Sequence, residues 1–188
     1  MTKLSIYFPG IGYTADKPLL YYGKCAAREA GYVNERKITY SYMPKDNLRG
    51  NSKKIKETYE VLFSQAESQL SDVDWASYDD VLFVSKSIGT VVASAYAQKH
   101  QLTQVRHILY TPLTQTFDFT PRSAIGFIGT ADPWSNAEEI LQLSQNTGIL
   151  MNVYDNCSHS LECNDTLRNI EILKDIMKKT LDYCLRKE

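Results

Sequence analysis

The sequence predicts an α/β protein: a three-layer α/β/α sandwich in which helices cover both faces of a mostly parallel, six-stranded sheet. Two observations predict this class. Short apolar or β-branched runs alternate with helical patterns along the chain. The run at 80–84 (DVLFV) is almost continuously apolar, as in a strand that is buried on both faces. A length of 188 residues suits one hydrophobic core, so we expect a single domain over 1–188.

The first part of the chain predicts two strands separated by a helix. Residues 3–8 (KLSIYF) form an apolar run that ends at a Pro-Gly turn, which is typical of a strand. Residues 16–30 predict a helix that Asp16 caps and Gly31 ends. Residues 36–42 (RKITYSY) are rich in β-branched and aromatic residues and predict the second strand.

The rest of the chain continues the alternation. Apolar residues recur every three or four positions over 51–74, which predicts a long amphipathic helix before the strand at 80–84. The later predicted strands are 105–110, 124–128 and 149–154, and the later predicted helices are 88–99, 136–145 and 167–185. Right-handed crossovers bring the carboxyl ends of parallel strands to one edge, where such sheets bind their ligands.

Composition excludes several classes of protein. Hydrophobic residues make up 43% and charged residues 23%, which is the balance of a globular chain. The net charge of -1 argues against a nucleic-acid partner. No run approaches the ~18 apolar residues of a membrane span, and no secretory signal is visible. The four cysteines form no C-x-x-C pair, so we expect reduced thiols, no metal and a cytoplasmic protein.

A tight turn directly follows the third predicted strand. Its residues are Ser85-Lys86-Ser87-Ile88-Gly89, with small residues two positions before and after the central serine. This arrangement fits a nucleophile elbow, in which a strained serine stands above the sheet edge at a helix N-terminus. The first position of the usual G-x-S-x-G pattern is serine here. The alternative is that Ser87 only caps the following helix.

Two further loops supply partners for that serine. Asp132 follows the fifth predicted strand and can orient a histidine, although a turn aspartate before proline is also common. His159 follows the sixth strand and is the histidine on the active edge, unless it is a surface loop residue. His100 and His107 fall where structural roles are expected. Asp155, in the histidine's own loop, is a rival for the acid. Serine, acid and histidine come in the chain order of α/β-hydrolases.

The loop after the first strand contains two glycines that let its backbone approach a substrate oxygen. The candidate oxyanion-hole donors are the backbone N–H groups of Ile11 in this loop and of Ile88 after the serine. A simple glycine turn is the alternative.

Four motifs together carry a resemblance that spans nearly the whole chain: FPGIG at 8–12, SKSIG at 85–89, GTADPW at 129–134 and CSHSLE at 157–162. With them the sequence resembles the α/β-hydrolase superfamily, in particular its small members without a cap. The resemblance implies a Ser87 nucleophile, a His159 base and an Asp132 orienting acid. It implies a serine hydrolase that cleaves a carboxylic ester or related acyl substrate through an acyl-enzyme, without a metal or organic cofactor.

The sequence departs from many α/β-hydrolases in two ways. It starts directly at the parallel core, and residues 111–122 are too few for a lid. We therefore expect an open site for a small-molecule acyl substrate. Tyr13, Leu113, Phe117 and Trp134 are candidate lining residues, although each could be ordinary packing. The chain could be a monomer or a homodimer.

Two other interpretations stay open. Gly10-x-Gly12-x-x-Ala15 follows a strand and fits a dinucleotide-binding fingerprint, but the second predicted strand ends without the acid that binds ribose. A hydrolase fold without catalysis would be a binding protein. Esterase, thioesterase and acyltransferase activities share one triad and are not separable here.

Overall fold

The computed structural model describes residues 1–42, 44, 48–119 and 121–185, and its centre is one six-stranded sheet. The strand order is β2-β1-β3-β4-β5-β6, and all five neighbouring pairs are parallel. The prediction of a mostly parallel six-stranded sheet is confirmed. The strands are β1 Lys3–Phe8, β2 Asn34–Lys37, β3 Asp80–Lys86, β4 Val105–Tyr110, β5 Ser123–Gly129 and β6 Leu150–Tyr154.

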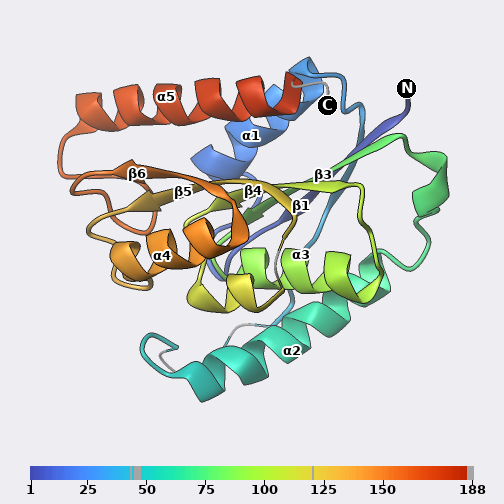
Figure 1. Ribbon diagram of the computed structural model, residues 1–188, viewed down its shortest axis with the longest axis horizontal. Coiled ribbons are helices and arrows are strands. Elements are labelled where there is room, and N and C mark those ends of the chain that lie inside the picture. The colour runs from blue at the N-terminus through green and yellow to red at the C-terminus, as the bar shows by residue number, and fades with distance from the viewer. Residues whose placement is uncertain (43, 45–47, 120, 186–188) are drawn as a thin grey trace.

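Helices cover both faces of the sheet, so the predicted three-layer sandwich is confirmed (Figure 1). On one face lie α1 (Pro18–Glu29) and α5 (Thr166–Leu185); on the other lie α2 (Ser52–Gln69), α3 (Ile88–Lys99) and α4 (Ala137–Thr147). Side chains of a strand point alternately to the two faces. In β3, Phe83 therefore packs into the α2–α3 core while Val84 packs into the α1–α5 core. This explains the nearly continuous apolar run that predicted a doubly covered strand.

The prediction of a second strand over 36–42 is wrong beyond its first two residues, because β2 ends at Lys37. One further backbone bond joins this segment to the sheet, from the N–H of Ile38 to the carbonyl of Tyr7 in β1 at 2.9 Å. Beyond Ile38 the segment bonds to a helix. The N–H groups of Thr39 and Ser41 donate to the side-chain oxygens of Gln69 and Gln65, at 3.0 and 2.9 Å. These glutamines lie one turn apart on α2, so they satisfy an extended segment that no neighbouring strand pairs with.

Two predicted helix ends also need correction. Asp16 does not cap α1; the N-cap is Lys17, without a side-chain cap bond, and Asp16 lies 4.0 Å from the ammonium of Lys37. The second helix ends at Gln69, and a short 3₁₀ turn follows at Trp75–Ser77. The other predicted strands and helices agree with the structure to within two residues.

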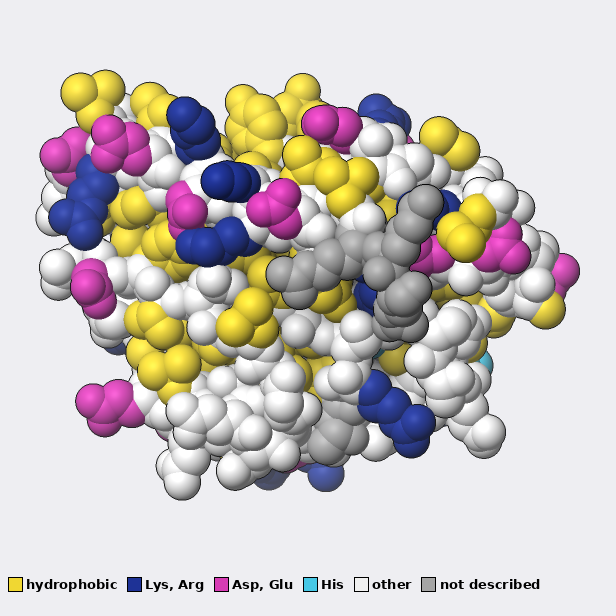
Figure 2. All heavy atoms as spheres, turned by 45° about the horizontal axis from the view of Figure 1, so that its top comes forward, with side chains coloured by type: hydrophobic (Ala, Val, Ile, Leu, Met, Phe, Trp, Pro, Cys, Tyr) yellow, Lys and Arg dark blue, Asp and Glu magenta, His cyan; other side chains and the backbone are white. Residues whose placement is uncertain are grey.

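The surface around α1 and α5 carries charges of both signs. Figure 2 shows Lys and Arg side chains interspersed with Asp and Glu, and with hydrophobic side chains between them. In the described ranges, no helix combines the length and the hydropathy that crossing a membrane requires.

Candidate active site

The predicted elbow is a single residue between a strand and a helix. β3 continues two residues further than predicted, to Lys86, and α3 begins at Ile88, so Ser87 alone makes the turn. Its φ of 57° and ψ of -131° are strained for a residue with a Cβ. Its N–H donates to the carbonyl of Tyr110 at 3.0 Å, which extends the sheet ladder to the serine. Ser87 occupies the N-cap position of α3 but makes no side-chain cap bond, so capping does not account for its hydroxyl.

Close packing explains the small residues that flank the elbow. A Cβ on Gly89 would lie 2.3 Å from the carbonyl oxygen of Phe8 and 2.4 Å from that of Pro9. Only glycine therefore allows the first turn of α3 to rest on the loop after β1. Ser85, which replaces the first glycine of the usual pattern, is fully buried and donates to the Ile108 carbonyl at 3.0 Å. That hydrogen bond satisfies the extra hydroxyl.

Three loops bring the predicted triad residues into contact. Ser87 Oγ lies 2.8 Å from His159 Nε2. His159 Nδ1 lies 2.7 and 2.9 Å from the two carboxylate oxygens of Asp132. The rival acid, Asp155, is exposed, and the carboxylate that contacts the histidine is that of Asp132. These loops follow β3, β5 and β6, as predicted for the carboxyl edge of a parallel sheet.

The loop that carries Asp132 and the loop that carries His159 pack against each other. A Cβ on Gly129 would lie 2.1 Å from the carbonyl oxygen of Cys157, so the two loops touch through backbone. Asp132 Oδ1 also accepts the N–H of Trp134 at 2.8 Å, and the Trp134 ring lies 5.7 Å from the His159 ring, centroid to centroid. The carboxylate is thus fixed by two donors, and the imidazole is covered by an indole.

Burial sets the protonation of the histidine. Removal from water lowers the pKa of His159, the hydrogen bond with Asp132 works against this, and Lys86 lowers the pKa further. The side chain of Asp132 is 0% exposed. The imidazole is therefore neutral, and able to accept a proton, at pH values where a free histidine would already be charged.

A cavity of about 410 Å³ opens beside the serine. The predicted lining residues Tyr13, Leu113 and Trp134 all contribute to its wall, whereas Phe117 does not and packs in a core with Leu109. The rest of the wall includes three residues that no sequence motif marks: Pro44, Leu48 and Ile55. They follow β2 or begin α2, and their only sequence signal is that they are apolar. The described residues between β4 and β5 form one short 3₁₀ helix, Thr114–Phe119, and no lid.

Both candidate oxyanion donors border the same cavity. Ile88 is the first residue of α3, where backbone N–H groups lack intrahelical partners. Ile11 lies in a turn that the Tyr13 N–H closes onto the carbonyl of Gly10, at 3.2 Å. A Cβ on Gly10 would lie 3.1 Å from Ser87 Cβ, so this turn packs against the nucleophile.

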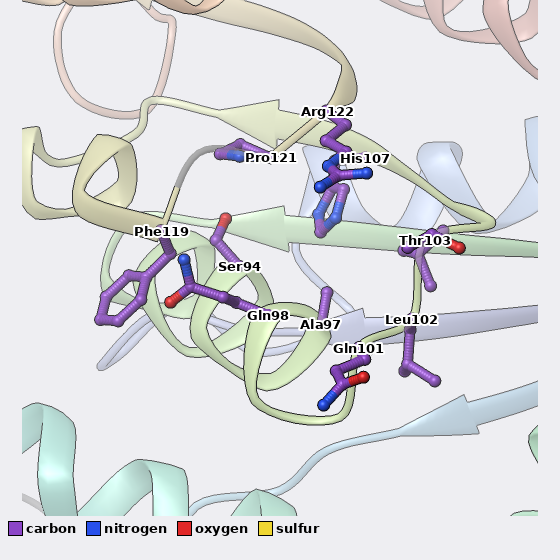
Figure 3. A pocket seen from close by; sticks show the side chains of 11 residues that line it. Ser94, Ala97, Gln98, Gln101, Leu102, Thr103, His107, Phe119, Pro121 and Arg122 are labelled. Carbon is purple, nitrogen blue, oxygen red and sulfur yellow. The ribbon is translucent and has the colours of Figure 1, made fainter.

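A second cavity, of about 280 Å³, lies at the end of α3 away from Ser87. His107 of β4, Ser94 of α3 and Arg122 line it (Figure 3). His107 is 2% exposed and stands edge-on to Phe83. Within the described residues, His107 Nδ1 and Ser94 Oγ have no hydrogen-bond partner. Burial lowers the pKa of His107 to about 3.

We expect this buried imidazole to make the protein sensitive to acid. Below pH 6.5 His107 becomes protonated in the unfolded chain, whereas in the folded chain it stays neutral down to about pH 3. The free energy of unfolding therefore falls by up to about 1.4 kcal/mol for each pH unit in that window. His107→Phe should flatten this fall in urea titrations from pH 7 to pH 4. A difference between variant and wild type that is constant with pH would contradict the assignment.

The chain is similar to known proteins in its three-dimensional structure and not in its sequence. No protein-family model and no curated protein sequence matches the chain. Solved structures do match it, first an α/β serine hydrolase homologue from Coxiella burnetii, with a TM-score of 0.67 and 16% identity over 95% of this chain and 84% of that one. The fold is that of the α/β-hydrolases.

Two further structures with this α/β-hydrolase fold are similar. An esterase from Pyrococcus furiosus has a TM-score of 0.65 and 12% identity over 96% of this chain and 81% of that one. An α/β serine hydrolase without a lid from Xanthomonas campestris has a TM-score of 0.60 and 13% identity over 99% of this chain and 84% of that one. At these identities the likeness shows the fold alone.

The glycine loop differs from a dinucleotide-binding fingerprint. In that fingerprint the loop opens directly into a helix at whose N-terminus the pyrophosphate binds. Here the loop forms a turn between Gly10 and Tyr13, and α1 begins only at Pro18. The loop lies at the switch point between β1 and β3, where the strand order reverses, and it packs against the elbow. Among the described residues, no three His, Cys, Asp or Glu side chains gather as a metal site would require.

Proposed function

We propose that the protein is a serine hydrolase that cleaves a carboxylic ester, or a related acyl substrate, through an acyl-enzyme intermediate. The observation that carries this proposal is the unbroken hydrogen-bond relay from Ser87 Oγ through His159 to Asp132, beside a cavity. A strained serine at the start of a helix supports the same assignment.

The residues divide the chemistry in the usual way of a serine triad. His159 Nε2 accepts the Ser87 proton while Oγ attacks the substrate carbonyl, and Asp132 holds the proton on Nδ1. The backbone N–H groups of Ile11 and Ile88 donate to the oxyanion. When the tetrahedral intermediate collapses, the bond between the carbonyl carbon and the leaving alcohol breaks. The alcohol takes the proton from His159, and the acyl group stays on Ser87. Water, activated by the same histidine, then releases the acid and restores Ser87.

The cavity favours a small substrate with an apolar acyl or alcohol part. Aliphatic and aromatic residues form most of its wall, and its volume of about 410 Å³ lies near the lower end for small-molecule sites. One structural neighbour is named an esterase, which supports an ester as the first substrate to test. Thioesters present a carbonyl of the same geometry and should be tested beside esters.

Covalent labelling with a fluorophosphonate probe tests the proposal. The wild-type protein should be labelled, whereas Ser87→Ala lacks the nucleophile and His159→Ala lacks its base, so labelling should be lost in both. His100→Ala is the matched control, because His100 lies at the C-terminal end of α3 and contacts Glu67. A folded wild-type protein that stays unlabelled would overturn the proposal and favour a binding protein with a hydrolase fold.

A further inference from the structure

Lys86 is a buried lysine directly before the candidate nucleophile. It is the last residue of β3, is only 2% exposed and forms part of the wall of the cavity beside Ser87. Burying an ammonium group is costly unless a charged or polar partner compensates for the loss of water. A lysine at this position therefore calls for an explanation that packing alone does not supply.

The ammonium of Lys86 rests on an aromatic ring. Its Nζ lies 4.9 Å from the centroid of the Tyr13 ring, in cation–π geometry. The Tyr13 hydroxyl accepts the N–H of Leu19 at 3.0 Å, which fixes the ring. Within the described part of the chain, Nζ has no hydrogen bond and no ion pair of its own. No carboxylate therefore neutralises the ammonium directly.

The charged groups around Lys86 come from the loops that build the triad. Asp132, after β5, and Glu162, after β6, attract its positive charge, and Tyr13 lies in the loop after β1. His159 also follows β6. The positive charge of Lys86 repels a protonated His159 and so lowers the pKa of the imidazole. Lys86 and His159 thus line the same cavity, and the carboxylate of Asp132 attracts the positive charge of both.

We propose that Lys86 is a positioning residue of the triad, whose ammonium disfavours the imidazolium form of His159 and so keeps the base neutral. The proposal rests on the proposed function in that His159 is the base. The electrostatic coupling between the two side chains can nevertheless be measured without any turnover.

The burial of Lys86 has an electrostatic consequence. Removal from water lowers the pKa of Lys86 to about 7, while Asp132 and Glu162 oppose that shift. When Lys86 carries its proton, its positive charge adds to burial in lowering the pKa of His159.

A histidine titration by NMR in wild type and Lys86→Met tests the coupling. Methionine keeps a similar chain length and removes the charge, so the His159 midpoint should move to higher pH. The chain has three histidines, and unchanged His100 and His107 signals would report an intact fold. Lys24→Met is the matched control, because Lys24 is 8% exposed and its Nζ lies 5.2 Å from the Tyr21 ring centroid, remote from the triad on α1. It should leave the His159 midpoint in place.

The outcomes separate this inference from the proposed function. A His159 midpoint that is the same in wild type and in folded Lys86→Met would overturn the role of Lys86, even if the probe labels Ser87. A midpoint that shifts in a protein without labelling would support the coupling and count against the hydrolase. If Lys86→Met does not fold, Lys86→Gln takes its place, with the same expected shift. In a labelled protein, the acid limb of the labelling rate should move to higher pH together with the midpoint.

Discussion

Asp132→Asn is expected to lower kcat for ester hydrolysis by about four orders of magnitude without unfolding the protein. Asp132 accepts from His159 Nδ1 at 2.7 Å and so holds the tautomer that leaves Nε2 free to accept the serine proton. An amide in its place can donate to Nδ1 and thereby place the imidazole proton on Nε2, facing Ser87. The base would then be unable to take up the serine proton.

The fold should tolerate this change, because the amide oxygen can still accept the N–H of Trp134. The measurement is kcat for hydrolysis of p-nitrophenyl acetate, together with the thermal unfolding midpoint. Asp155→Asn is the control: this exposed residue of the histidine loop should retain nearly full activity. Equal losses in both variants, or an active Asp132→Asn protein, would contradict the assigned acid.

Gly89→Ala is expected to reduce the free energy of unfolding by about 3 kcal/mol or more. In a free helix this change would favour folding by up to about 1 kcal/mol. Here the new Cβ would lie 2.3 and 2.4 Å from two backbone carbonyl oxygens, which cannot rotate away as a side chain can. The loop after β1 would have to move, and with it Ile11 beside the nucleophile.

Gly23→Ala on α1 provides the matched comparison. A Cβ there would lie 3.1 Å from the Tyr110 hydroxyl and 3.4 Å from a Val84 methyl, which are ends of side chains. We expect this variant to stay within about 1 kcal/mol of wild type. Urea unfolding of both proteins gives the two values. A Gly89→Ala protein as stable as Gly23→Ala would show that α3 does not need its close approach to β1.

Most of the fold follows from local patterns that the sequence displays. The DVLFV run at 80–84 predicts a central strand, because only a doubly covered strand is apolar on both sides. The predicted strand over 36–42 is too long, since β-branched and aromatic residues after Lys37 suit any extended segment. Whether such a segment pairs with the sheet depends on Gln65 and Gln69, far away in sequence.

In the candidate site, too, some residues could be predicted from local sequence patterns and others could not. Ser87, Asp132 and His159 could be predicted because each follows a recognisable strand. The role of Lys86 could not, even though it stands inside the elbow motif, because the motif leaves that position unspecified. Its importance comes from enclosure by Tyr13 and by loops after other strands, which no local pattern encodes. The same holds for the wall that Leu48 and Ile55 add to the cavity.

The strand order also has a consequence for how the chain reaches its native state. β1 pairs with β3, so that Leu4 lies opposite Val81, and the intervening chain includes α1, β2 and α2. No hairpin can nucleate this sheet, since every neighbouring pair is parallel and non-local, and such topologies fold slowly. On the ribosome, the amino-terminal strand must wait for its central partner to be synthesised. We expect the strained turn at Ser87 to become fixed only when distant segments have met, because its N–H bonds to Tyr110 and the neighbouring Gly89 packs against Phe8.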